Sequence, residues 1–456
     1  VSNLNWQTES LSLTNILYKI PLMNLTQPSY ISFKSEFAQL LAGEAGGVQD
    51  NASYIDDFEN TKGTIDVMTP TSWVISSVPS LNFKDDYNDK TGLTSGYHRS
   101  RLAWYTIDPL FTRRGSSLTP GHIKSDLKQL SNHYVREVYV KELFPLRQQS
   151  TYQGATSTLS VLNLAYYPSE PGPYNFNVSD LQSDGTLANP SRNWGGMMRK
   201  LDTNDFEQAN VEYIEFWMLD PFIYSREQSD AADYGGDFYI NLGEVSEDIL
   251  RDGKKFYESG MPVDGSNSFT YTQWGKIPTQ STVTYAFATT SGSRALQDVG
   301  FNGLTDAEEQ EFYKSAYLNQ IQGKVNQAVF DSIFADPARD NYHYFRGSDW
   351  DEMRAPILQR YKYINNPQGN SPDSESRTES YDTSYKSTPD VEDINQDYTL
   401  NDYEKYLEYP VSIRPEDFVV GSNFIVVKRE YTQTWRDNTK STVTWYQFRI
   451  PVYEFD

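Results

Sequence analysis

Alternating apolar and polar positions predict strands near the start of the chain. In residues 29–41 the apolar side chains of Ile31, Phe33 and Phe37 alternate with polar ones, which is the period-two pattern of a strand with two unlike faces. Together with residues 5–12, this segment predicts two antiparallel strands. The same alternation is typical of a transmembrane barrel strand and of a half-buried strand in a soluble sheet, so the pattern leaves both open.

Further strand-like runs follow a glycine-rich break at residues 43–47. Long irregular connections separate these runs, which favours antiparallel sheets with insertions over regular βαβ winding and predicts a mainly β sandwich. The predicted strands are 72–77, 158–166, 211–219, 237–242, 282–289, 418–428 and 442–452. Helical spacing of apolar residues is confined to 123–130, 246–253 and the longer run 306–334.

One segment without periodicity predicts a mobile loop. Residues 365–390 combine Asn, Pro, Gly, Ser, Asp and Thr, with almost no apolar side chains except tyrosines. The predicted domains follow from these breaks. They are a strand hairpin at 1–45, the first part of a β-sandwich at 46–290, a helical and calcium-loop insertion at 291–410, and returning strands at 411–456.

Composition narrows the function. The 456 residues carry 62 Asp and Glu against 39 Lys and Arg, a net charge of −23, which disfavours nucleic acid as a partner. With no cysteine and four histidines, thiol chemistry is excluded and zinc sites are disfavoured. No apolar run approaches the length of a membrane helix, and the start at Val1 indicates an excised or processed piece.

The residues from 393 to 404 have the spacing of an EF-hand calcium loop. Oxygen-bearing side chains occupy positions 1, 3, 5, 7 and 12 of a loop that curls around the ion, where position 7 offers its backbone carbonyl and position 12 closes the shell. Tyr398 stands where the turn prefers glycine. The predicted ligands are Asp393, Asn395, Asp397, Thr399 and Glu404, the last on the first turn of an exiting helix. The alternative is an acidic, solvated helix N-terminus.

A second candidate calcium loop covers residues 298–309. Donors fall at positions 1, 5, 9 and 12, and Gly303 takes the turn position. The predicted ligands are Asp298, Asn302, Asp306 and Glu309. The alternative, which is compatible with the first, is a helix start in which Thr305 is the N-cap and Glu308 completes a capping box. Calcium at either loop would be structural, because no nucleophile or open coordination position is implied.

No residues form a recognisable catalytic motif. Neighbouring Asp56 and Asp57 would point to opposite faces of a strand, so they do not predict a catalytic carboxylate pair. GxSxG, HExxH and phosphate-binding glycine motifs are missing from the sequence. The sequence therefore predicts a protein that is not an enzyme.

Several longer motifs resemble one family. They are YIDDFE at 54–59, NLAYYPSE at 163–170, WGGMMRK at 194–200, EYIEFW at 212–217 and NLGEVSED at 241–248. They resemble the SprA family, called Sov in some species, the outer-membrane translocon of the type 9 secretion system and gliding motility in Bacteroidetes. The resemblance runs through most of the chain and includes both calcium-like loops.

The resemblance implies a large outer-membrane β-barrel through which folded proteins are secreted, with inserted domains that cap it. Residues 1–45 would then be barrel strands, and the remainder a jelly-roll-like insertion between strands. Expected partners are secreted cargo proteins and other outer-membrane components of the secretion system. Acidity and calcium loops favour a cap at the extracellular face, where calcium is millimolar; a gate on the periplasmic side is the alternative.

A different function class stays open at this point. Many sugar-binding sandwiches begin with a similar acidic strand, so a carbohydrate-binding or adhesin module at the cell surface is the alternative to a translocon segment. Such a module needs an exposed row of aromatic side chains. Exposure of Trp194, Trp350 and Trp435 would therefore favour it, whereas Trp217, among apolar residues of a strand, is expected in the core. Glycoside hydrolysis would need a facing carboxylate pair, and the sequence nominates none.

Overall fold

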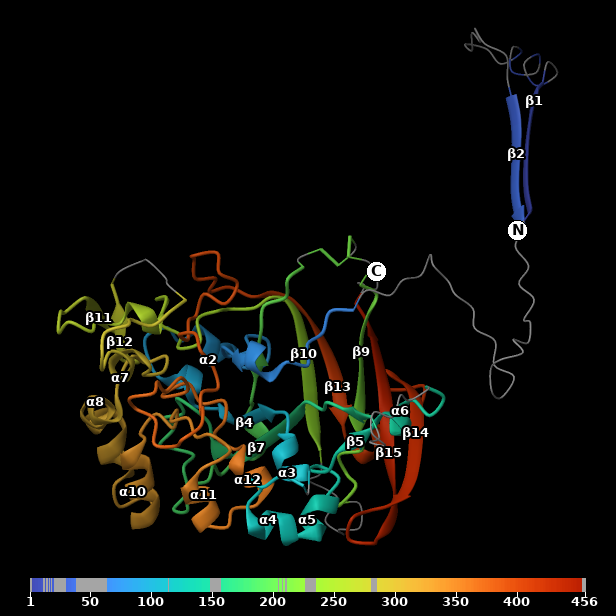
Figure 1. Cartoon of the computed structure of the whole chain (residues 1–456). Coiled ribbons are helices and arrows are strands. Elements are labelled where there is room, and N and C mark those ends of the chain that lie inside the picture. Colours follow the sequence, from blue (N-terminus) through green and yellow to red (C-terminus); the bar gives the residue numbers. More distant parts are fainter. Residues whose placement is uncertain are drawn as a thin grey trace. The chain divides into compact units, whose positions relative to one another are not determined.

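The computed structural model divides the chain into two compact units, residues 1–63 and 64–456 (Figure 1). It describes residues 2–10, 13, 15, 17, 19, 30–37 and 64–452, apart from 114, 148–156, 204, 207, 210, 226–234 and 280–284. The YIDDFE motif at 54–59, with Asp56 and Asp57, lies outside the described residues.

The first unit contains an antiparallel pair of strands, as the alternation predicts. Strands β1 (Ser2–Glu9) and β2 (Tyr30–Phe37) pair along their whole length, with Trp6 opposite Phe33. Directly opposed residues share a face, so Leu4, Trp6, Ile31 and Phe33 gather on one side, and all four are exposed. The hairpin therefore presents an apolar face that its own two strands do not cover.

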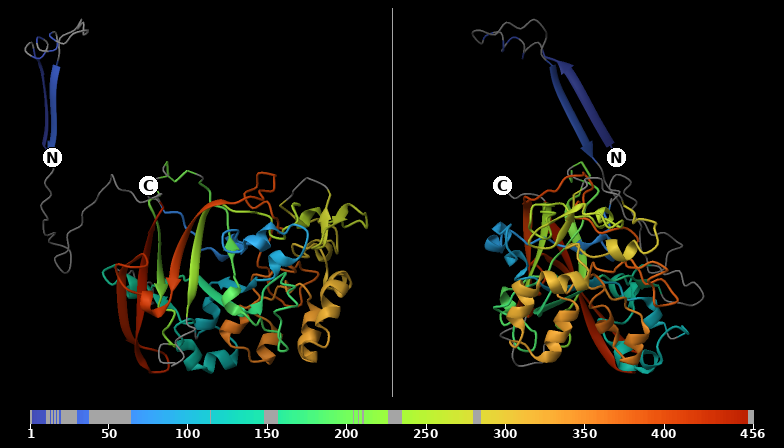
Figure 2. Two further views of the ribbon diagram at one scale, coloured as in Figure 1. Left: turned by 180° about the vertical axis from the view of Figure 1, so that it is seen from behind. Right: turned by 90° about the vertical axis from the view of Figure 1, so that its left-hand side faces the viewer.

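A β-sandwich occupies one end of the second unit, opposite the helices α7, α8 and α10 (Figures 1 and 2). Its two sheets share one hydrophobic core, which contains Phe216, Phe238, Val411 and Phe448. The larger sheet has the order β14 (Ile425–Thr434), β15 (Lys440–Pro451) and β9 (Tyr213–Leu219), and the smaller pairs β10 (Gly236–Glu244) with β13 (Lys405–Ile413), all antiparallel.

The central strand β15 is buried on both faces. Its odd-numbered residues Val443 and Trp445 enter a core beneath helix α6 (Val140–Leu143), while Tyr446 and Phe448 enter the core between the sheets. Successive side chains of a strand point to opposite faces, so a strand between two cores reads as nearly continuous apolar sequence. Trp217 on β9 packs partly buried against the α6 side, as predicted.

Shorter antiparallel ladders connect the rest of the unit. They are β3 (Val74–Ile75) with β8 (Met197–Met198), β4 (Ser100–Tyr105) with β7 (Asn163–Pro171), β5 (Val138–Tyr139) with β6 (Thr158–Leu159), and β11 (Phe269–Tyr271) with β12 (Lys276–Pro278). The prediction of a mainly antiparallel β fold with helical and loop insertions is confirmed. Within the described residues, no helix combines the length and apolar character that crossing a membrane requires.

Most helices are short. The longest predicted helix, 306–334, forms four consecutive pieces whose apolar side chains, including Leu318, Ile321 and Ile333, enter the largest core. These pieces are α8 (Asp306–Phe312), the π-helical turn η7 (Lys314–Leu318), α9 (Asn319–Ile321) and α10 (Gln327–Ala335). The other α-helices are α2 (Lys84–Asn88), α3 (Pro109–Thr112), α4 (Gly121–Ser125), α5 (Leu127–Ser131), α7 (Arg294–Gln297), α11 (Ser348–Glu352) and α12 (Ile357–Arg360). The 3-10 turns are η2 (Pro70–Ser72), η3 (Thr94–Gly96), η4 (Pro190–Arg192), η6 (Glu258–Gly260) and η8 (Pro415–Asp417).

Two predicted elements are wrong. Residues 246–253 are irregular, with bends and no helix, because the carboxylate of Asp248 accepts the backbone N–H groups of Asp252 and Gly253 at 3.1 Å each. A side chain that satisfies backbone donors competes with a helix. The predicted strand at 282–289 is not formed by residues 285–289, and its start lies outside the described residues.

The predicted loop at 365–390 contains neither helix nor strand. It is nevertheless attached to the unit: Asn365 exchanges hydrogen bonds of 2.8 and 2.9 Å with the backbone of Trp104 in β4, and Asn370 and Ser371 are buried. Its mobility stays a prediction, as does the finer division of the chain at residues 45, 290 and 410.

Candidate metal centre

Helix α8 begins where the second calcium-like loop was predicted to end. The Glu308 carboxylate accepts a hydrogen bond of 3.0 Å from the Thr305 backbone N–H and completes a capping box. The predicted helix start at Thr305 is therefore confirmed. It places Asp306 and Glu309 one turn apart on the same helix face.

Three carboxylates converge beside this helix start, and a fourth lies nearby. Oxygens of Asp306, Glu309 and Asp336 lie within 4.8 Å of one another. Asp336 follows the last residue of α10, and the charges of all three act on Asp340, four residues after Asp336. We refer to Asp306, Glu309, Asp336 and Asp340 as the carboxylate cluster.

Three members of the cluster have hydrogen-bond donors. Asp306 accepts from the side-chain amides of Asn341 at 3.0 Å and Gln368 at 3.2 Å. Glu309 accepts from the Asn302 amide at 2.5 Å and from the backbone of Ala338 at 3.0 Å. Asp336 accepts the backbone N–H groups of Asp340 and Asn341.

Asp340 is fully buried and lies beside the Tyr174 hydroxyl. A hydrogen bond between this hydroxyl and the carboxylate acts on the pKa of both groups. The hydroxyl oxygen also accepts a hydrogen bond of 2.8 Å from the Phe301 backbone. A buried carboxylate with few hydrogen-bond donors is costly.

The electrostatics of the cluster are unfavourable for four charged carboxylates. Burial raises the pKa of the Glu309 carboxyl to about 8 and raises the pKa values of Asp306 and Asp336. For Asp340, burial followed by the charges of Glu309 and Asp336 raises the pKa well above the usual range. Nearby Arg101 and Arg339 offset part of this at Asp336.

Buried ion pairs of the described residues lie elsewhere, and none includes a member of the carboxylate cluster. They join Arg136 to Glu142, Arg251 to Asp248 and Lys386 to Asp390. Among the described residues the cluster therefore has no direct ion-pair partner of the kind that buried carboxylates usually have, and Arg101 and Arg339 act on it without an ion pair.

The predicted ligand Asp298 lies among other acidic residues. It accepts a hydrogen bond of 2.9 Å from the Ser371 backbone and interacts with Glu258 and Asp390. Burial raises the pKa of the Asp298 carboxyl to about 7. Of the four residues predicted for this loop, Asp306 and Glu309 are members of the carboxylate cluster and Asn302 donates a hydrogen bond to Glu309. Asp298 faces a separate group.

The loop at 393–404 is organised by its own hydrogen bonds. Asp393 is fully buried and accepts the backbone N–H groups of Asp397 at 3.0 Å and Tyr398 at 2.9 Å. Asn395 also accepts from Asp397, and Asp397 accepts from the backbone and hydroxyl of Thr399. Tyr398 adopts φ 66°, the left-handed conformation that glycine favours at this turn. The sharp turn expected of the loop is thus present with tyrosine in place.

Glu404 does not follow the prediction that it begins a helix. Residues 401–404 are irregular and strand β13 starts at Lys405, because residues 405–413 pair with β10. The Glu404 carboxylate accepts a hydrogen bond of 2.9 Å from the Ser80 backbone. Asp393, Asp397 and Glu404 do not form a group of the kind found at the carboxylate cluster. Calcium at this loop stays a prediction.

Other buried carboxylates of the unit accept hydrogen bonds from the backbone of irregular segments. Glu247 accepts the N–H groups of Ile394, Asn395 and Asn401. Glu392 does the same for three backbone N–H groups, at residues 249, 250 and 256. These side chains replace secondary structure in satisfying backbone donors, and sequence reasoning missed both.

Asp336 and Asp340 were also missed. They enclose the stretch DPARD, which follows the amphipathic helical run. A proline just after a helix marks its end, and the return of α10 toward α8 brings this end to the helix start at Thr305. Two carboxylates at a predicted helix end, one helix hairpin away from a predicted acidic loop, were the available signal.

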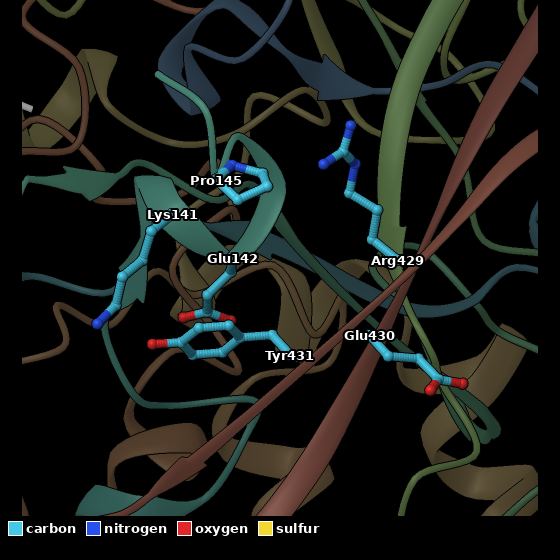
Figure 3. A pocket seen from close by; sticks show the side chains of 6 residues that line it. All are labelled: Lys141, Glu142, Pro145, Arg429, Glu430 and Tyr431. Atoms are coloured by element: carbon cyan, nitrogen blue, oxygen red, sulfur yellow. The ribbon is translucent and has the colours of Figure 1, made fainter. Parts of the chain in front are cut away.

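A surface pocket of about 340 Å³ lies between α6 and β14 and is lined by Lys141, Glu142, Pro145, Arg429, Glu430 and Tyr431. Figure 3 shows Lys141, Arg429 and Glu430 pointing away from one another, so they do not converge on a bound group. Glu142 is held by Arg136 at 2.7 and 2.8 Å. The pocket therefore offers no facing carboxylate pair of the kind that glycoside hydrolysis needs.

Comparison with known proteins finds a family match for the C-terminal part of the chain. Residues 316–456 match the SprA_N model, described as a motility related/secretion protein, and no curated protein matches the chain. The matched residues include Asp336 and Asp340 of the carboxylate cluster and the strands β13, β14 and β15. This match agrees with the family that the sequence motifs resemble, and it indicates a motility-related or secretion function for the matched part. Residues 316–456 of the chain are therefore similar to the SprA_N family, described as motility related/secretion protein.

Proposed function

We propose that this chain is a structural, non-catalytic segment of an outer-membrane translocon of the type 9 secretion system, and that its second unit belongs to a cap at the extracellular face. The observation that carries the proposal is the match of residues 316–456 to a secretion family. The partners are secreted cargo proteins and the other outer-membrane components of the system.

The hairpin of the first unit supports membership of a membrane barrel. Leu4, Trp6 and Phe33 on its apolar face are each at least half exposed, and Gln7 and Ser32 pair on the opposite face. A barrel strand has this division, with one face toward lipid and the other toward a polar interior. The parent barrel supplies the remaining strands under this proposal.

The carboxylate cluster supports a structural role. Glu309 and Asp340 are fully buried, whereas a catalytic acid or base must reach a substrate. The buried acidic residues of this unit accept hydrogen bonds from loops and helix ends. They therefore stabilise a rigid fold, as a structural cap requires.

The three Trp side chains that a sugar-binding module would expose are buried. Trp194, Trp350 and Trp435 are 8%, 5% and 7% exposed, and the Trp350 indole donates to the Tyr344 backbone at 2.8 Å. Side chains that complete a protein core do not stack on a glycan. The specific residues proposed to distinguish the two functions therefore favour the translocon segment.

The extracellular placement is tested by labelling cysteines in cells. Because the chain has no cysteine, Ser374→Cys on the exposed part of the 365–390 loop adds a defined target. We expect a membrane-impermeant maleimide to label Ser374→Cys in intact cells, and Ser371→Cys, whose position is 1% exposed, to resist it. The protein without substitution reports labelling elsewhere in the parent. Labelling of Ser374→Cys only after the outer membrane is permeabilised would favour the periplasmic gate.

A further inference from the structure

We propose that the free edge of strand β10, the edge that faces away from β13, binds an extended peptide segment of another protein. The bound segment has apolar side chains on one face and basic side chains on the other. It adds a strand to the smaller sheet of the sandwich (Figure 1). The inference does not rest on the proposed function, because it concerns the chemistry of one strand edge.

The hydrogen bonds of β13 show which backbone groups of β10 face outward. The Asn423 side chain accepts from the Ser412 backbone N–H at 2.9 Å and donates to the Ser412 carbonyl at 2.8 Å. Ser412 lies opposite Asp237, so this pair has no ladder bonds, and bonded and non-bonded pairs alternate along an antiparallel ladder. The backbone N–H and C=O groups that point away from β13 are therefore those of residues 237, 239, 241 and 243.

These outward groups have no partner, whereas the other edge of the sheet is closed. The backbone groups of residues 237, 239, 241 and 243 bond to none of the residues that the structure describes. On the β13 edge, Asn423 occupies Ser412, and Pro410 has no N–H to offer. Unpaired groups in a row form a template for a further strand. The sheet thus accepts an added strand at β10 and resists one at β13.

The core of the sandwich is incompletely covered along the same side. Phe238 and Ile240 of β10 and Phe216 of β9 are only partly buried, whereas Val411 of β13 and Phe448 of β15 are 0% exposed. The rings of Phe216 and Phe238 are in contact, with centroids 6.4 Å apart, so β9 and β10 lie on one side of the sandwich. Apolar side chains of an added strand would cover this side.

Charge selects the kind of strand that binds. Asp237 and Glu244 are exposed near the two ends of β10, and the whole chain carries a net charge of −23. A second copy of the chain would bring acidic residues against acidic residues, which is unfavourable. A strand that carries Lys or Arg meets opposite charge. The occupant is therefore a basic segment of a different protein.

The pleat of β10 fixes the pattern of the bound segment. Directly opposed residues of neighbouring strands share a face. Side chains on the face of Phe238 and Ile240 meet the core and are apolar. Side chains opposite Asp237 and Tyr239 lie on the outer face and are basic. Regular alternation of valine and lysine satisfies both faces.

The test is a titration of the purified chain against a fluorescent peptide of about ten residues in which valine and lysine alternate, followed by fluorescence anisotropy. We expect binding, and replacement of every lysine by glutamate should weaken it at least about tenfold. Backbone N-methylation of the lysines removes the N–H groups that face β10 and should also weaken binding at least about tenfold. The same methyl groups on the valines, whose N–H groups face away, should leave binding unchanged.

The matched change in the chain is Tyr239→Pro. Proline removes an outward N–H but no ladder bond, and its neighbour across the ladder is already Pro410, so we expect the fold to persist. Tyr239→Pro should weaken binding of the valine–lysine peptide at least about tenfold. Tyr239→Val keeps the N–H and should bind the peptide as the unchanged chain does. The methylated peptides test the same contact without any change in the chain.

Three results would overturn the proposal. The first is that the valine–lysine peptide does not bind. The second is that lysine methylation or Tyr239→Pro leaves binding unchanged, which would reduce it to general attraction between a cationic peptide and an acidic protein. The third is that the purified chain sediments as a dimer and Tyr239→Pro as a monomer, which would make a second copy the occupant. Each of these results would leave the secretion function untouched.

Discussion

Replacing Arg136 by methionine is expected to lower the free energy of unfolding by about 3–5 kcal/mol. Its guanidinium binds both oxygens of Glu142 at 2.7 and 2.8 Å, and the two side chains are 4% and 0% exposed. Methionine fills much of the space but leaves a buried carboxylate without its counter-charge. Urea unfolding followed by circular dichroism measures the change.

The matched control for this prediction is the double variant Arg136→Met/Glu142→Gln. It removes both charges, and the glutamine oxygen can still accept from the Tyr139 backbone N–H, which now donates to Glu142 at 2.9 Å. A buried pair replaced on both sides costs far less than one broken on one side. Equal loss of stability in the single and double variants would show that Arg136 acts through packing, for example against Trp435, and not through its charge.

The second large effect is expected at Phe176, whose replacement by alanine should cost about 3–5 kcal/mol. Phe176 is 1% exposed, and its ring centroid lies 4.1 Å from that of Tyr313 and 5.3 Å from that of Tyr317. Through these two rings, Phe176 packs the segment that follows β7 against the end of α8 and the π-helical turn. Truncation leaves a cavity among rigid rings that cannot close around it, and urea unfolding again reports the loss.

Leucine at the same position provides the graded comparison. Phe176→Leu should cost about 1–2 kcal/mol, because it keeps an apolar group of similar size. Leu146→Ala, at a side chain that is 95% exposed, should leave stability unchanged. If Phe176→Ala were as mild as Leu146→Ala, the aromatic core around Tyr313 would not be a stabilising centre of the unit.

Elements that bury a regular pattern of side chains could be predicted from sequence. The run at 211–219 forms β9, and the run at 442–452 lies largely within β15, because a strand between two cores is apolar on both faces. The run at 306–334 shows helical spacing, since one stripe enters the largest core. Its division into four pieces was not visible, because a π-helical turn preserves most apolar spacing.

Elements fixed by distant partners could not be predicted in this way. The acidic stretch at 246–253 has a helical pattern, but backbone N–H groups bind Asp248 there. Strand β13 exists because β10, more than 160 positions earlier, pairs with it. At the candidate site, Asp306 and Glu309 followed from local spacing, whereas Asp336 and Asp340 depend on how α10 returns to α8.

The central claim, that the second unit serves secretion as a folded structural segment, is tested most directly by secretion from cells whose translocon carries Arg136→Met/Phe176→Ala. Phe176 lies in the largest core, whereas Arg136 packs on Trp435 of another core. Their costs should therefore add to an amount comparable with the whole stability of a domain, about 5–15 kcal/mol. Protease sensitivity would verify unfolding, with Leu146→Ala as control. Cargo in the medium, normalised to translocon in the outer membrane, should fall sharply in the double variant and stay unchanged in the control. Secretion at the control level from a translocon whose second unit is unfolded would contradict it.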